Sequence, residues 1–193
     1  MIAAEVFLWG TRIGVVLQEN STSIAKFNFD EKFLKSHIEV APIVMPLSKQ
    51  VYSFPALNME TFKGLPGMLC DSLPDKFGTK LVERYLAEQG MNLKELTSVE
   101  RLCYVGKRGM GALEYVPAKE YFNTPDQSLN LNALVQLASD ILSERESIHV
   151  KGDNHAMEQI IKVGTSAGGA RAKAVIAWNE QTGDIRSGQV DAG

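Results

Sequence analysis

"EVFLWG" (5–10), followed by "IGVVLQ" (13–18) and "SIAKFNF" (23–29), is the part of the sequence that decides the fold class. Each stretch is a short apolar or partly alternating run, and Gly10, Gly14 and polar residues lie between or within them. Such runs are typical of β-strands, and the alternation in 23–29 is what a half-buried strand requires. The first third of the chain is therefore expected to be rich in β-structure.

The segment after residue 29 combines a helical turn with extended chain. Asp30 can cap a short helical turn through "EKFLKS" (31–36). "PIVMPLS" (42–48) is expected to be extended, because its prolines suppress helix and bias the residues before them towards β.

From residue 56 the apolar period changes to that of helices. Residues 65–90 are expected to form two helices broken at Pro74, with Asp75 as N-cap and Gly90 as the stop. A further helix is expected over 93–106, ending at Gly106. "GALEYVP" (111–117) is then the strand that closes the first unit.

The second part of the chain begins after a polar linker at 118–128, which contains Pro125. A shorter helix is expected over 153–163, then a strand at 172–178, a turn at 179–184 and a second strand near 185–190. The clearest predicted helix lies before these elements, between the linker and residue 153. Its apolar residues recur at helical spacing: Leu131, Leu134, Val135, Ala138, Ile141 and Leu142.

These elements predict a mixed α+β fold in two parts, 1–117 and 118–193. The second strand of the last hairpin has begun, but the sheet it should join is not yet built when the sequence stops at Gly193, so the chain is expected to be the N-terminal part of a longer protein.

The composition is that of a globular protein, since 45% hydrophobic residues over 193 positions can bury a substantial core. The net charge of −3 disfavours direct DNA binding by this chain and gives no attraction to anionic lipid. The N-terminus lacks a basic start followed by a long apolar run, so it is not a signal peptide. A cytoplasmic protein with no membrane partner is expected.

Metal and nucleophile signals are weak. Cys70 and Cys103 make neither a disulfide framework nor a zinc site, and are expected to be buried thiols in a reducing compartment. The three histidines, His37, His149 and His155, are scattered, so no metal site is expected. Asp71 and Asp75 could be read as paired carboxylates, but helix punctuation and solvation explain both.

The stretch "TSAGGARAK" (165–173) has the ingredients of a phosphate cradle. It has paired glycines, hydroxyls at Thr165 and Ser166, and cations at Arg171 and Lys173. It fits neither the Walker pattern nor the G-x-G-x-x-G spacing. On these residues alone a Gly-Gly hinge before a buried strand is the simpler interpretation, and a phosphate-binding loop is the alternative.

The whole sequence nevertheless resembles the N-terminal portion of the HipA family, the serine/threonine kinase toxins of bacterial toxin–antitoxin pairs. No single stretch is decisive, and the resemblance rests on the order and spacing of several. They are "VFLWGTRIGVV" (6–16), "IAKFNFDEKFL" (24–34), "PIVMPLS" (42–48), "GLPGMLCDSLPDKFG" (64–78), "GALEYVP" (111–117) and "GTSAGGARAKAVIAW" (164–178).

The resemblance implies a small β-containing N-terminal subdomain at 1–117, followed by the start of a kinase N-lobe at 118–193. It implies ATP and Mg²⁺ as cofactors, and it places autophosphorylation on Ser166, with Thr165 as a hydroxyl that could compete. The family's nucleotide-pairing lysine, catalytic base and metal-binding aspartate match no position here, so the segment alone should be inactive. The implied nucleotide-binding residues are Gly168, Gly169, Ala170, Arg171 and Lys173, of which Arg171 stands where the family varies.

The implied partners are a DNA-binding HipB-like antitoxin and a protein substrate, by family analogy a translation component. Two other functions stay open from the sequence. One is a stand-alone binding or antitoxin-like module that regulates a separate HipA-like kinase. The other is a small α+β domain whose Gly-Gly turn binds an unrelated anion.

Overall fold

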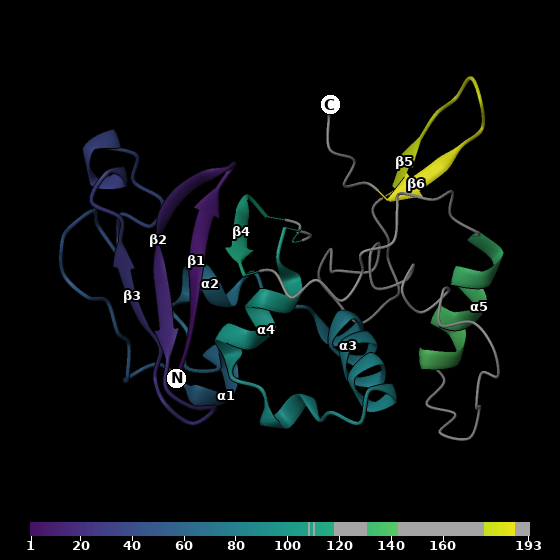
Figure 1. The fold of residues 1–193 in the computed structure, drawn as a ribbon, viewed down its shortest axis with the longest axis horizontal. Helices are drawn as coiled ribbons and strands as arrows, with labels where there is room; N and C mark the ends of the chain where they lie inside the picture. The colour runs from purple at the N-terminus through teal and green to yellow at the C-terminus, as the bar shows by residue number, and fades with distance from the viewer. Residues whose placement is uncertain (108, 110, 118–130, 143–175, 188–193) are drawn as a thin grey trace. The chain divides into compact units, whose positions relative to one another are not determined.

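The fold described here is that of a computed structural model, which describes residues 1–107, 109, 111–117, 131–142 and 176–187 (Figure 1). The chain divides into two units, and each is described by itself. The first unit is Met1–Leu73 with Lys94–Lys119, and the second is Pro74–Leu93 with Glu120–Gly193. The predicted α+β class is confirmed. The boundary expected at 117/118 stays a prediction, because residues 118–130 lie outside the described part.

The first unit is built on an antiparallel hairpin of β1 (Ile2–Leu8) and β2 (Thr11–Gln18) (Figure 1). Its two-residue connection is Trp9 and Gly10, whose φ angles are 46° and 75°. Positive φ at both central residues matches the right-handed twist of the two strands, so this turn holds the hairpin register. The register shifts between Val6 and Phe7, where the hairpin contains a bulge or irregularity.

Two more strands complete a four-stranded sheet of order β3-β2-β1-β4, in which β3 is Lys26–Phe29 and β4 is Leu113–Val116. β4 pairs antiparallel with β1, so a strand distant in the sequence lies beside the first one. The strands expected at 5–10, 13–18, 23–29 and 111–117 are thereby confirmed, with shifted ends.

Helix α4 (Ser98–Val105) contacts β1, β2 and β4 and covers the core side of the sheet. Its start is fixed by a capping box, in which Thr97 and Glu100 exchange side-chain to backbone hydrogen bonds. Gln18, buried on β2, accepts a hydrogen bond from Val99 N (3.2 Å) and donates one to Ser23 O (2.8 Å). A polar side chain therefore joins sheet and helix inside the core without losing its partners. The helix expected over 93–106 begins only at Ser98, because Leu93–Glu95 form a separate 3₁₀ helix and Thr97 caps α4. Its end at Gly106 is as expected.

Short elements connect the strands. The Asp30 carboxylate accepts from Lys32 N (2.8 Å) in the turn before the 3₁₀ helix η1 (Phe33–Ser36). The N-cap position of η1 is Lys32, with no side-chain cap hydrogen bond, so the cap expected at Asp30 is wrong: Asp30 holds the preceding turn and not the helix end. The first of the two helices expected in 65–90 is reduced to a single turn. The remaining short elements are α1 (Met59–Phe62), α2 (Gly67–Cys70) and η2 (Leu93–Glu95).

The extended structure expected for 42–48 is wrong, because the chain turns there. Met45 N donates to Ala41 O (2.8 Å), and the Met45 side chain is fully buried. Pro42 excludes regular helix, but its fixed φ suits the second position of a tight turn. The turn lets Met45 enter the core and Leu47 pack against it, while Ile43 and Val44 stay exposed.

The described elements of the second unit are α3 (Lys76–Glu88), α5 (Leu131–Leu142) and the hairpin of β5 (Ile176–Trp178) and β6 (Ile185–Ser187). α3 begins where expected, since Asp75 Oδ1 accepts from Gly78 N (2.8 Å), and Gly90 follows its end with φ 71°. The helix predicted over 131–142 is confirmed. No helix in the described part of the chain is long and apolar enough to cross a membrane.

Candidate functional site

The predicted phosphate loop lies outside the described residues, as do the linker at 118–128, the helix at 153–163, and His149 and His155. Nothing is therefore reported of the loop's geometry. The loop residues concerned are Thr165, Ser166, Gly168, Gly169, Ala170, Arg171 and Lys173.

The hairpin that follows the predicted loop is described. β5 starts three positions after Lys173 and pairs antiparallel with β6. The connecting turn is closed by Asn179, whose side chain accepts from Gln181 N (2.9 Å) and Thr182 N (3.2 Å). An Asp or Asn that bonds its own following backbone is a common way to hold a turn. The hairpin thus gives the C-terminal end of the loop a defined strand to join.

One face of this hairpin is apolar. Ile176 pairs with Ser187 and Trp178 pairs with Ile185, so these side chains lie on the same face, while Ala177 and Arg186 lie on the other. Ile176 is 42% exposed and Trp178 is 61% exposed. The described part of β5 is therefore not the buried strand that the simpler interpretation of "TSAGGARAK" expected.

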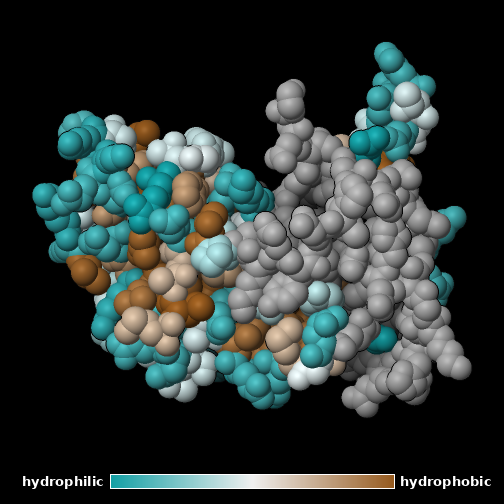
Figure 2. All heavy atoms as spheres, viewed as in Figure 1, coloured by the Kyte–Doolittle hydropathy of each residue, from teal (hydrophilic) through white to brown (hydrophobic). Residues whose placement is uncertain are grey.

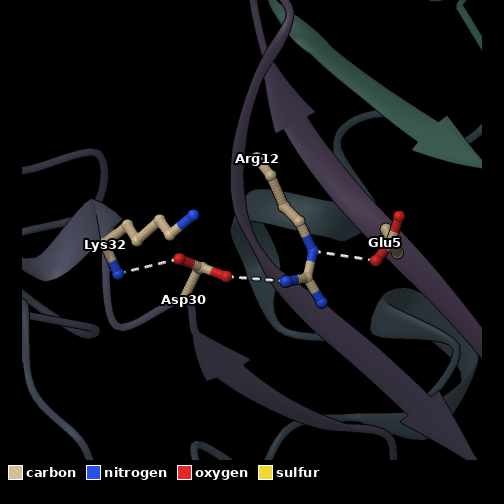
Figure 3. A network of polar contacts seen from close by, with 4 residues as sticks. All are labelled: Glu5, Arg12, Asp30 and Lys32. Carbon is tan, nitrogen blue, oxygen red and sulfur yellow. Dashed lines mark hydrogen bonds and ion pairs between the residues drawn. The ribbon is translucent and has the colours of Figure 1, made fainter.

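A polar network on the first unit joins three strands, as Figure 3 shows. Arg12 on β2 contacts Glu5 on β1 through Nε (2.9 Å) and Asp30, just after β3, through Nη1 (2.6 Å). The Asp30 carboxylate also accepts from Lys32 N, as described above. Arg12 and Glu5 are both more than a third exposed, so solvent screens the pair and the network stabilises the sheet only weakly. The network is a set of surface ion pairs that link neighbouring strands.

The outer face of the sheet, opposite the core, carries half-buried apolar side chains. On the face of the first unit that Figure 2 shows, hydrophobic atoms lie over β1 and β2 among polar ones. Trp9 at the hairpin tip is 79% exposed. The half-buried residues that alternate with the core positions are Phe7, Val15, Leu17 and Val116.

The two cysteines differ in their surroundings. Cys103 is buried on α4, as expected, but the expectation is wrong for Cys70, which is only half-buried because it lies at the end of the one-turn helix α2. Burial, and next the charge of Asp71, raise the pKa of the Cys70 thiol. A raised pKa keeps the thiol protonated and therefore unreactive at neutral pH.

Alkylation should show this difference. We expect Cys70 to react with iodoacetamide more slowly than a free cysteine at about pH 7.5. Its reaction rate should also increase with pH, and this increase should occur at a more alkaline pH than it does for free cysteine. The sign follows from the raised pKa, because less thiolate is present at each pH. Peptide mass spectrometry after timed alkylation measures both sites. A Cys70 rate equal to that of free cysteine at pH 7.5 would show that its surroundings do not suppress the thiolate.

Other candidates for chemistry are explained by structure. Asp75 caps α3, and Asp71 is an exposed residue at the end of α2, so a position at a helix end explains both and solvation is confirmed for Asp71. His37 is exposed with φ 57°, at the end of η1. No cluster of His, Cys, Asp or Glu that could hold a metal ion occurs among the described residues.

These observations define the structural class of the first unit. The first unit is a small α+β domain in which an antiparallel four-stranded sheet is covered by α4. The family model of the HipA N-terminal domain matches residues 4–116, more than half of the 193-residue chain and the span from β1 to the end of β4. The chain belongs to the HipA family. No curated protein sequence matches it.

The match confirms the family expected from the ordered motifs, and it ends at Val116, before the glycine-rich stretch. The loop assignments therefore stay predictions. Sequence reasoning missed the Arg12 network, because its members are separated by 7 and 18 positions in sequence and meet only through the strand register. The alternation of Glu5 and Arg12 with apolar neighbours was the one available signal.

Proposed function

We propose that this chain is the N-terminal region of a HipA-type serine/threonine protein kinase, which transfers a phosphoryl group from ATP to a protein. The observation that carries the proposal is the family match over 4–116, followed in the expected order by "TSAGGARAK" and the strand β5. The proposed setting is the cytoplasm.

The nucleotide would be held by the loop at 165–173. Gly168, Gly169 and Ala170 let backbone N–H groups approach an anion without obstruction by large side chains. Arg171 and Lys173 supply positive charge beside that cradle. Phosphoryl transfer is catalysed mainly by positioning and by neutralising charge, and this donor set suits both tasks.

Mg²⁺ bound with ATP would neutralise charge on the β- and γ-phosphates. We assign no catalytic base and no metal ligand within 1–193. The residues of this chain are proposed to bind and orient the phosphates, and the chain alone is proposed to be inactive.

Ser166 is proposed as the site of inhibitory autophosphorylation, with Thr165 as the competing hydroxyl. A phosphate adds roughly −1.5 to −2 charges at neutral pH. Such an anion in the space of the ATP phosphates would repel them and compete for the same N–H donors. Phosphorylation of the loop would therefore lower nucleotide affinity.

The proposed partners are a DNA-binding HipB-like antitoxin and a protein substrate involved in translation. The net charge of −3 supports a division in which the partner, and not this chain, contacts DNA.

The regulatory proposal is tested on the full-length gene product. We expect Ser166→Ala to keep its kinase activity and Ser166→Glu to lose at least about tenfold, because the added charge opposes the phosphates. Phosphate transfer from labelled ATP in the presence of Mg²⁺ is measured, together with the mass gain of the peptide that contains residue 166. Thr165→Ala is the matched control and should keep the mass gain.

Equal activity of Ser166→Ala and Ser166→Glu would remove the regulatory role of Ser166. Absence of any phosphate transfer by the full-length protein, with its partner removed and several proteins offered as substrates, would contradict the kinase assignment.

A further inference from the structure

Helix α3 lies inside the segment that matches the family, yet it belongs to the second unit. Pro74–Leu93 groups with Glu120–Gly193, and α3 contacts α5. The family-matched segment thus contributes one helix to a unit whose other described members all come after residue 117.

The apolar side of α3 is extensive. Its large apolar side chains recur at intervals of four residues along one face of the helix, and each is no more than 8% exposed. A stripe of this size stabilises the fold only while something covers it, since it would otherwise face water. These residues are Phe77, Leu81, Val82, Tyr85 and Leu86.

On α5, two neighbouring residues differ sharply in burial. Leu134 is 6% exposed and Val135 is 69% exposed. The sequence pattern places both among the apolar positions of the helix, so the structure distinguishes the position that is packed from the one that is not. This pair provides a buried test position and an exposed control one residue apart.

We propose that α3 is the docking helix for α5, and that the two form one cooperative unit that opens separately from the four-stranded sheet. Proteins open locally and sub-globally in cooperative units whose free energies of opening differ. Pro74 precedes the Asp75 cap of α3, and Gly90, with φ 71°, follows its end, so both ends of the helix are sharply defined in the chain. The inference does not depend on the kinase function.

The test is amide hydrogen exchange of the 193-residue chain, measured by mass spectrometry. In Leu134→Ala, exchange is expected to rise at least about tenfold across Lys76–Glu88, while that of β1 and β2 stays within about twofold of wild type. The matched control Val135→Ala should leave exchange in α3 unchanged, because its side chain is exposed.

The reciprocal variant is Leu81→Ala, whose side chain is 1% exposed on α3. It should speed exchange in α5 and spare the sheet. Faster exchange in α5 with none in α3 for Leu134→Ala would overturn the docking proposal. Loss of protection throughout the chain, including β1 and β2, would overturn the claim of a separate cooperative unit.

Discussion

The Tyr115→Ala variant is expected to lose about 3–5 kcal/mol of unfolding free energy in the first unit, the range for removing a large buried aromatic side chain. Tyr115 on β4 is the largest fully buried side chain among the described residues, at 0% exposure. Its hydroxyl donates to Ser72 Oγ at 2.7 Å, so it joins the sheet to the chain after α2. Its removal leaves both a cavity and a hydroxyl without its partner. Urea unfolding monitored by circular dichroism measures the loss.

Tyr115→Phe is the control that separates the two contributions. It keeps the ring and removes only the hydrogen bond, so we expect a loss of about 1 kcal/mol. Burial also raises the pKa of the Tyr115 phenol, so the neutral form favours the folded state. The stability that this neutral phenol contributes is fully present below about pH 10, the pKa of an unfolded tyrosine, and is lost progressively as the pH rises from there through the raised pKa of the folded state. Tyr115→Phe should lack this part of the alkaline destabilisation. Equal losses for the alanine and phenylalanine variants would contradict the packing role of the ring.

The Gly14→Ala variant is expected to lose about 3 kcal/mol, at the upper end for overpacking a tight core. A Cβ at this position on β2 would collide with the backbone oxygen of Asn28 and lie 2.6 Å from Cζ of Phe27. Both neighbours belong to β3, and a backbone atom cannot turn aside as a side chain can. The β2–β3 pairing should therefore loosen, which the same urea unfolding would detect.

Gly111→Ala is the matched control, because nothing lies within 4 Å of a Cβ built there. Its effect should stay within about 0.5 kcal/mol, as for surface substitutions without a special role. If Gly14→Ala were as harmless as Gly111→Ala, the close packing of β2 on β3 would be contradicted.

The strands and the longer helices could be predicted from sequence because their patterns are local. The partial alternation in 23–29 and the apolar spacing of 131–142 each depend on residues within one element. Asp75, Gly90 and Gly106 are equally local signals for helix ends. All of these predictions are confirmed by the structure.

Features that depend on distant residues could not be predicted. In 42–48 the apolar residues look equivalent, and only tertiary packing decides that Met45 is buried and Ile43 is 94% exposed. The Arg12 network needs the register of three strands, which a list of strands does not contain. The grouping of α3 with residues after 117 likewise has no local signature, since an apolar helix face does not name the element that covers it.

The candidate site depends on the sequence and the family. The match to the HipA N-terminal domain covers the sheet and α4, where the described residues include no metal-binding cluster. The chemistry proposed for this protein lies instead in "TSAGGARAK". The assignment of this stretch to phosphate binding rests on its residue types and on its place in the order of the family's motifs. Binding of a nucleotide there is the central claim.

The most direct test is an ATP titration of the 193-residue chain in the presence of Mg²⁺, followed in ¹H–¹⁵N NMR spectra. We expect the amide signals of Gly168 and Gly169 to shift and saturate, while those of β1 and β2 do not move. Lys173→Ala should weaken this binding about tenfold, the loss of one charge-assisted contact, and Lys49→Ala, an exposed lysine of the first unit, should leave it unchanged. Signals of Gly168 and Gly169 that stay in place at millimolar ATP would contradict the proposed phosphate-binding loop.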